Sequence, residues 1–241
     1  MRQLSVLFGL ILCFTFNLNA QKTAPSPDEI ATAYLEAIGG AEAWKEVKSM
    51  RFSGKANMQG QDFPFVMTRA EGNKFYQEVS IMGSKMEQGF NGETAWMLFP
   101  MQGINEKTAM SEEESKEFQE EEFLDVFIGY ADRGFKLEAV DGKEIEGTPT
   151  YGVRVTNEGS YDKTYYFETE NLVPIMISSV GKSGQTKGMT VEMYMSDYQE
   201  VDGLMMPMFM DMKINGNSFQ KLTMTKGEMN VEIDDAIFEL K

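Results

Sequence analysis

Apolar and polar residues alternate along most of this chain, which is the pattern of β-strands with one buried face and one wet face. In the stretch 49–58, for example, Met50, Phe52, Ala56 and Met58 share one face. Asn91-Gly92 lies between two such stretches and is a strong hairpin signal. The alternation predicts further strands over residues 63–67, 75–81, 86–90, 94–99, 151–155, 161–167, 172–178, 189–195, 206–214 and 219–226.

Helical spacing occurs at two places. Ser26-Pro27-Asp28-Glu29 is a capping box with proline at the first helical position, and Gly39-Gly40 ends the helix that it predicts. A short turn at 41–47 follows. A second capping box at Ser111 and Glu114 opens an acidic run, after which Phe123, Leu124, Phe127 and Ile128 recur at helical spacing and are expected to continue the helix.

Many strands and few helices predict the α+β class: a strongly curved antiparallel sheet with helices covering its concave face. No linker divides the chain after its first 20 residues, so we expect residues 21–241 to form one domain.

The first residues have the features of a secretory leader. Arg2 precedes the apolar run 4–16, and Leu18-Asn19-Ala20 fits a cleavage site, which predicts a signal peptide over residues 1–20. Cys13 as a lipid-attachment cysteine is the alternative, although Leu12 stands where a small residue is usual. No later segment approaches the roughly 20 apolar residues of a membrane-spanning helix. We therefore expect an exported protein without a membrane span after cleavage.

Composition narrows the chemistry. The chain has no histidine, its one cysteine is Cys13, and its net charge of -16 disfavours nucleic acid as a partner. Histidine zinc sites, Ser-His-Asp triads and Cys-His pairs are thereby excluded, and a carboxylate pair is the remaining catalytic option. The acidic run 112–122 is a solvated helix face or a calcium site, but it lacks the spacing of a calcium loop. We predict no enzyme, no cofactor and no metal.

The 20 methionines are the unusual feature of the composition. Methionine is flexible and polarizable, so a wall rich in it can repack around ligands of varied shape. Two interpretations stay open, a binding wall or a filled core under the sheet. The residues concerned alternate in two neighbouring strands: Met193, Met195, Met206, Met208, Met210 and Met212.

Arg69 has the same parity as Phe63, Phe65 and Met67, so alternation directs it toward the apolar face at the end of its strand. If it points inward, its guanidinium is expected to bond a carbonyl of the lid helix or a polar head group. The alternative is that the guanidinium reaches water while only the stem lies on the apolar face.

The stretch 91–100, NGETAWMLFP, resembles the DGKTLWFYNP stretch of LolA-type periplasmic lipoprotein carriers. The stretches 37–40, 201–207 and 231–238 resemble the related outer membrane lipoprotein-sorting proteins of Bacteroidetes. This resemblance implies an incomplete β-barrel closed by helices around a cavity that holds acyl chains, in the periplasm. It also implies a cavity arginine at Arg69 that contacts the lid, although Ala70 stands where the carriers have proline.

We therefore expect a carrier or chaperone of lipid or lipoprotein acyl chains, working with a membrane-bound donor or acceptor protein. The alternative is a noncatalytic interaction or scaffold domain whose core is filled by its own side chains. The expected ligand-binding residues are Phe63, Phe65, Met67, Arg69, Trp96, Phe123, Leu124, Phe127, Ile128, Met193, Met195, Met206, Met208 and Met210.

Overall fold

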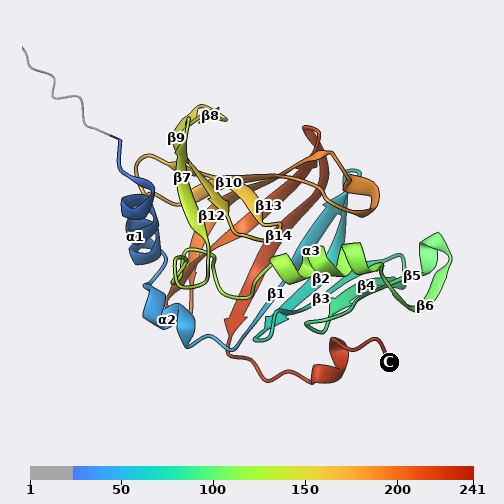
Figure 1. The fold of residues 1–241 in the computed structure, drawn as a ribbon. Coiled ribbons are helices and arrows are strands. Elements are labelled where there is room, and N and C mark those ends of the chain that lie inside the picture. The colour runs from blue at the N-terminus through green and yellow to red at the C-terminus, as the bar shows by residue number, and fades with distance from the viewer. Residues whose placement is uncertain (1–23) are drawn as a thin grey trace, which may run out of the picture.

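One antiparallel sheet organises the molecule (Figure 1). The computed structural model describes residues 24–241, so the expected signal peptide, 1–20, lies outside the described residues. The strands of the first half are β1 (Ser49–Met58), β2 (Gln61–Ala70), β3 (Lys74–Ile81), β4 (Ser84–Phe90), β5 (Ala95–Phe99) and β6 (Ile104–Ala109). Those of the second half are β7 (Lys136–Val140), β8 (Glu144–Ile145), β9 (Thr148–Thr156), β10 (Asp162–Glu168), β11 (Pro174–Val180), β12 (Thr190–Val201), β13 (Leu204–Ile214) and β14 (Asn217–Met229).

The two halves of the chain form two meanders that join side by side. The strand order is β6-β5-β4-β3-β2-β1-β14-β13-β12-β11-β10-β9-β7, and β8 pairs with β9 beside this path. The join is the β1–β14 ladder, in which Phe52 lies opposite Gly227. The alternation and the Asn91-Gly92 turn therefore predicted the strands well: Phe90 pairs with Ala95, and the Asn91 side chain accepts the backbone N–H groups of the turn.

The expectation of an α+β fold with a strongly curved, barrel-like sheet is corrected. The chain is mostly β, with few helices, and the sheet is neither closed nor strongly curled. Alternation fixes which face of a strand is buried, whereas curvature depends on bulges and twist. The irregularities are few and scattered, as at Ser53/Gly54 in β1 and Met212/Lys213 in β13.

Within the described residues, three α-helices accompany the sheet. They are α1 (Pro27–Ala37), α2 (Ala41–Lys45) and α3 (Glu112–Glu120), and both predicted capping boxes are present. The helix expected to run through Phe123 to Ile128 is wrong: α3 ends at Glu120, and turns occupy the chain up to β7. No helix within residues 24–241 has the length and apolar character needed to cross a membrane.

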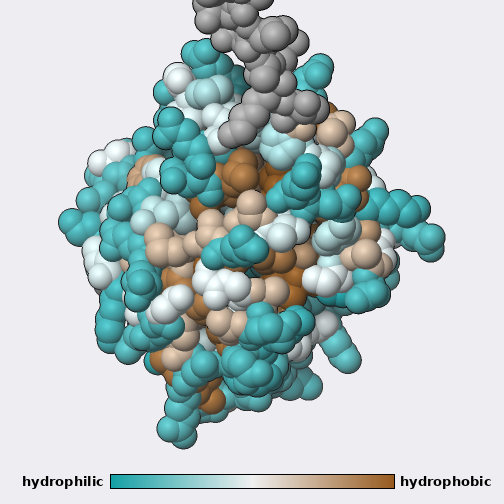
Figure 2. Space-filling model, turned by 90° about the vertical axis from the view of Figure 1, so that its left-hand side faces the viewer, coloured by the Kyte–Doolittle hydropathy of each residue, from teal (hydrophilic) through white to brown (hydrophobic). Residues whose placement is uncertain are grey.

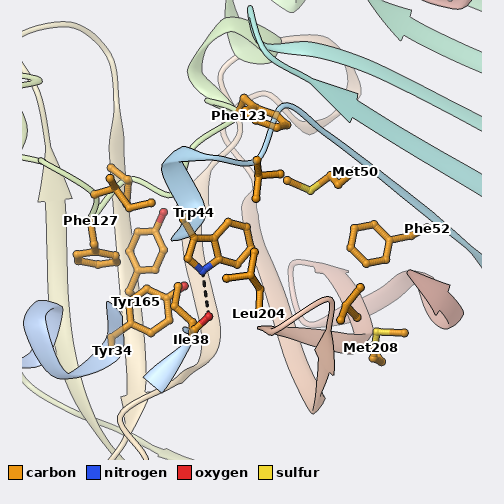
Figure 3. Packing of buried hydrophobic residues seen from close by; sticks show 14 of the residues in the cluster. Tyr34, Ile38, Trp44, Met50, Phe52, Phe123, Phe127, Tyr165, Leu204 and Met208 are labelled. Atoms are coloured by element: carbon orange, nitrogen blue, oxygen red, sulfur yellow. Dashed lines mark hydrogen bonds between the residues drawn. The ribbon is translucent and has the colours of Figure 1, made fainter. Parts of the chain in front are cut away.

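The core lies on one face of the sheet, where α1, α2 and the turns after α3 cover it. Phe52 on β1, Phe167 on β10 and Ile38 after α1 are each at most 2% exposed. Figure 3 shows Trp44 of α2 against this cluster, with its indole N–H donating to the carbonyl of Ile38 at 3.0 Å. Seen from the side of α1, the surface is mostly hydrophilic, and hydrophobic groups gather toward the middle of that face (Figure 2).

The opposite face of the sheet has its own covering at the β4–β5 end. Trp96 is fully buried there, and its indole N–H donates to the carbonyl of Phe238 at 2.7 Å. The C-terminal segment that carries Phe238 thus closes over the indole. Gly89 lies directly opposite in β4, and a Cβ atom added there would be 2.5 Å from the Trp96 ring.

The Gly89→Ala change should therefore destabilise the protein by about 1–3 kcal/mol, because an added methyl group overpacks a fully buried contact. Urea unfolding monitored by tryptophan fluorescence measures the change. Ser84→Ala in the same strand is the control and should stay within about 0.5 kcal/mol of wild type. Equal stability of the two variants would contradict the close packing of Trp96 on Gly89.

Candidate functional site

A cavity of about 220 Å³ lies between the core face of the sheet and the chain that follows α3. Three methionines of the predicted wall, Met195, Met206 and Met210, line it from β12 and β13. The other lining residues are Tyr34, Trp44, Met50, Arg69, Glu120, Glu121, Glu122, Phe123, Leu124, Asp125, Val126, Phe135, Tyr161, Tyr165, Pro174, Ile177, Tyr198, Met205 and Pro207. The site thus collects residues from both halves of the sheet.

The predicted site residues are not all brought to this cavity. Met193 pairs with Ile177 and Met212 one step along the sheet, whereas Met208 is 4% exposed within the core. Phe65 is buried on the core face, and Phe63 and Met67 pack against it there, but none of the three lines the cavity. Trp96 lies on the other face, bonded to Phe238.

Strict alternation fails in β12 for a local reason. Asp197 has φ of 54°, a left-handed conformation that changes which face the following residues present. As a result Met195 and Tyr198, three residues apart, both line the cavity. The alternation of β12 therefore predicts that Met195 faces the cavity, but it does not predict the same for Tyr198.

Residues 121–128, which we call the lid segment, form one side of the cavity. Phe123 and Leu124 line the cavity, while Phe127 and Ile128 are 1% and 2% exposed and anchor the segment in the core. The Phe127 ring packs edge-on against Tyr34 and Tyr165, with centroid distances of 5.6 and 5.0 Å (Figure 3). The four predicted lid residues therefore divide into a cavity pair and an anchoring pair.

Arg69 points toward the lid segment, as its parity in β2 predicts. Its guanidinium donates to the carbonyls of Glu121 and Glu122, each at 2.7 Å. These carbonyls follow the last turn of α3, where helix carbonyls lack partners of their own and attract a cation. Burial lowers the pKa of Arg69, which still leaves the group charged. Arg69 thus connects β2 to the lid segment, and Lys163 on β10 pairs with the carboxylate of Glu121 from the other half of the sheet.

Side chains also fold the lid segment locally. The carboxylate of Asp125 accepts the N–H of Phe127 at 2.9 Å, a bond that competes with helical bonding. Asn73, in the β2–β3 turn, accepts the N–H of Phe123 at 2.8 Å. These two bonds replace helical hydrogen bonds, so the segment does not continue the helix despite its helical spacing. The sequence could not predict this, because Asn73 lies 50 residues away from Phe123.

One wall of the cavity carries hydroxyl groups and one carboxylate. Tyr34 donates to Asp125 at 2.6 Å, and the hydroxyls of Tyr161 and Tyr165 lie 2.5 Å apart in a hydrogen bond. Burial raises the pKa of Asp125, against the opposing effect of its bonds from Tyr34 and Phe127. Tyr198 bonds the carbonyl of Pro174 at 2.6 Å. A ligand in this cavity would meet apolar side chains and, at this wall, polar groups that already have partners.

Helix α3 bridges the two halves of the sheet. On one side the Ala95 N–H donates to the Ser115 hydroxyl at 3.0 Å. On the other side Glu117 accepts the backbone N–H groups of Lys182 and Ser183 at 2.6 and 2.7 Å, in the β11–β12 connection. A second space of about 320 Å³ lies between α3 and this connection, and Glu120 and Glu121 line both spaces.

Metal chemistry has no candidate centre in residues 24–241, because no group of three or more acidic, histidine or cysteine side chains is arranged to hold an ion. The acidic residues of α3 pair with lysines instead: Glu120 with Lys182, and Glu113 with Lys187 at 3.1 Å. Through these pairs the acidic residues of α3 attach the helix to the β11–β12 connection.

The Arg69→Leu change should loosen the lid segment, because it removes two charge-assisted hydrogen bonds to Glu121 and Glu122. We expect hydrogen exchange of amides in 121–128 to become faster by about tenfold. The control is Arg51→Leu, on the other face of neighbouring β1, which should leave this exchange unchanged. Unaltered exchange in Arg69→Leu would remove Arg69 from the closure of the lid.

The raised pKa of Asp125 predicts a pH dependence. An acid whose folded pKa lies above its unfolded value favours folding while protonated, so this contribution is lost as pH rises through the folded pKa. Relative to wild type, Asp125→Asn should therefore gain stability as the pH rises above about 4, the ordinary pKa of aspartate in the unfolded chain. Denaturant unfolding over this range measures the difference, and a difference that stays constant with pH would contradict the assignment.

Comparisons with known proteins relate this architecture to solved structures. No family model and no curated protein matches the sequence. One similar structure is a domain from Vibrio parahaemolyticus that is provisionally assigned as an outer membrane lipoprotein-sorting protein. Its TM-score is 0.55 and its sequence identity 9%, and the match covers 88% of this chain and 95% of that one. A LolA superfamily protein from Nitrosomonas europaea has a TM-score of 0.56 and 9% identity, over 90% of this chain and 98% of that one. A DUF1329 family protein from Desulfovibrio piger has a TM-score of 0.55 and 12% identity, over 89% of this chain and 98% of that one. The chain therefore has the fold of the LolA superfamily and of outer membrane lipoprotein-sorting domains, as the resemblance at Asn91 predicted.

Proposed function

We propose that this protein is a noncatalytic periplasmic carrier that holds acyl chains of a lipid or lipoprotein between its sheet and the lid segment. The observation that carries the proposal is the cavity of about 220 Å³, walled by Met195, Met206 and Met210 and closed by Phe123 and Leu124. Apolar burial drives binding in such a site, at roughly 0.8 kcal/mol per methylene. The LolA-type fold supports the same conclusion.

The size of the cavity defines what must move. Sites for small molecules typically measure roughly 300–1,000 Å³, so the closed cavity admits only part of a lipid tail. Displacement of Glu120 and Glu121, which line both spaces, would join the cavity to the larger space under α3. Methionine side chains can then repack along an acyl chain, because they are unbranched and flexible.

The Arg69 contact supplies the energy difference between closed and open states in this proposal. Opening the lid segment breaks the bonds to the carbonyls of Glu121 and Glu122, and a hydrated guanidinium recovers part of that loss. A membrane-bound donor or acceptor that supplies alternative partners for the guanidinium would lower the cost of opening. Transfer of the acyl chain then depends on competition between the lid carbonyls and the membrane-bound partner for the Arg69 guanidinium.

The competing function is a noncatalytic interaction or scaffold domain with the same fold. One observation favours it: Phe127 and Ile128 anchor the lid segment at 1% and 2% exposure, so closure is well packed. In that case the methionines only fill space, and Arg69 serves stability. The two functions differ in whether an acyl chain enters.

Uptake of a fluorescent fatty acid tests the proposal. Wild type should bind the probe, and Met210→Glu should weaken binding by at least about tenfold, since a carboxylate in the wall must be desolvated or protonated. Met210→Leu keeps the wall apolar and should retain binding within about threefold. If wild type takes up no probe, or if both variants bind like wild type, the cavity is not an acyl-chain site.

A further inference from the structure

The hairpin turns of an antiparallel meander alternate between two ends of the sheet, so every second turn lies at the same end. Five turns at one end, on the side away from α1 and α2 in Figure 1, share a composition. We call them the apolar rim: residues 57–61 (β1–β2), 80–85 (β3–β4), 100–105 (β5–β6), 180–190 (β11–β12) and 213–221 (β13–β14). The β9–β10 turn, which lies at this end too, carries the acidic Glu158 and is not included.

The large exposed hydrophobic residues of the described chain gather on this rim. Met82 is 83% exposed, Met101, Val180 and Phe219 are each 59% exposed, and Met189 is 37% exposed. All five lie in rim turns, and the turns at the other end of the sheet contribute none to this set within residues 24–241. Single exposed hydrophobic residues are ordinary, but here all five lie at the same end of the sheet.

Met82 is the clearest member of the set. It occupies the first position of the Met82-Gly83 turn with φ of 48°, where asparagine, aspartate or glycine is favoured. A methionine there gains nothing from conformation, and at 83% exposure it gains almost nothing from packing. The residue is therefore poorly explained by folding and well explained by contact with something apolar.

Charge is divided between the two ends of the sheet. The rim turns contain five lysines and no aspartate or glutamate, in a chain with 38 acidic residues. Every connection at the opposite end carries an acid: Glu71, Glu93, Glu170 and Asp202, together with four acids in the segment 230–241. All five rim lysines pair with acids that lie outside the rim turns: Lys85 with Glu78, Lys182 with Glu120, Lys187 with Glu113, Lys213 with Glu146 and Lys221 with Asp211.

We propose that the apolar rim docks the protein on a phospholipid bilayer, with Met82, Met101 and Phe219 inserted at the headgroup boundary. The most exposed rim lysines, Lys85 and Lys187, then exchange their acidic partners for lipid phosphates. The tips sit on separate turns that span eight strand spacings, about 40 Å along the sheet. Apolar tips on separate turns suit a deformable surface, whereas a rigid partner protein would require one continuous patch. Lysines beside apolar side chains are the combination that binds anionic lipid surfaces.

The rim also borders the second space. Val180 and Lys182 of the β11–β12 connection line it, and it adjoins the cavity through Glu120 and Glu121. A docked protein would therefore present this space to the bilayer. The docking surface goes beyond the proposed carriage and does not depend on it, because a bilayer can be bound whether or not the cavity takes up an acyl chain.

Flotation with vesicles of phosphatidylethanolamine and phosphatidylglycerol (3:1) tests the rim, using exported protein whose mass shows that the leader is removed. Wild type should float with the vesicles. The double variant Met82→Asn/Phe219→Ser should bind about tenfold more weakly, because two of the inserted side chains become polar. Its melting temperature should not fall by more than about 2 °C, since both positions are exposed and asparagine favours the conformation of residue 82.

The matched control is Leu172→Asn, since Leu172 is also an apolar turn residue with positive φ, of 54°, but lies at the opposite end. It should float like wild type. Met210→Glu should also float normally while losing fatty acid uptake, which separates this surface from the cavity. The proposal is overturned if wild type does not float, if the double variant floats as well as wild type, or if Leu172→Asn loses as much binding.

Discussion

The closed state of this protein depends on the contact between Arg69 and the end of α3. A guanidinium on β2 donates to two carbonyls of the lid segment, each at 2.7 Å, and so fixes the lid segment over a sheet that is open at both edges. The bonds of Asn73 and Asp125 then fold the segment, and Phe127 anchors it among Tyr34 and Tyr165. Asn73 and Lys163 hold the start of the same segment, through the carbonyl of Gln119 and the carboxylate of Glu121. The cavity exists because these contacts keep Phe123 and Leu124 above the methionine wall.

Local patterns in the sequence predicted much of this fold. The strands follow from alternation, α1 and the start of α3 from capping boxes, and the inward direction of Arg69 from its parity with Met67. Long-range effects could not be predicted in the same way. The end of α3 depends on Asn73, which lies 50 residues from Phe123, and the degree of sheet curvature depends on bulges that leave no pattern. Tyr198 lines the cavity together with Met195, three residues away, because Asp197 interrupts the alternation of β12.

The two ends of the sheet have different physical characters, and this division gives the molecule a direction. One end carries apolar turn tips and lysines, and the other carries an acid in each connection. The space under α3 lies beside the apolar end, and the cavity adjoins it at Glu120 and Glu121, which line both. An acyl chain leaving a bilayer would thus meet the space under α3 first and the methionine wall second. Carriage and docking are separate proposals, but they use adjoining parts of one structure.

The central claim is that the methionine wall surrounds a ligand. Native mass spectrometry of the protein, purified without detergent, tests this claim most directly, because it reads the mass of whatever the cavity retains. The account predicts a population heavier than the bare chain by the mass of a lipid or acylated molecule, which mild activation releases. Bare protein in repeated preparations, and after incubation with excess fatty acid, would contradict it.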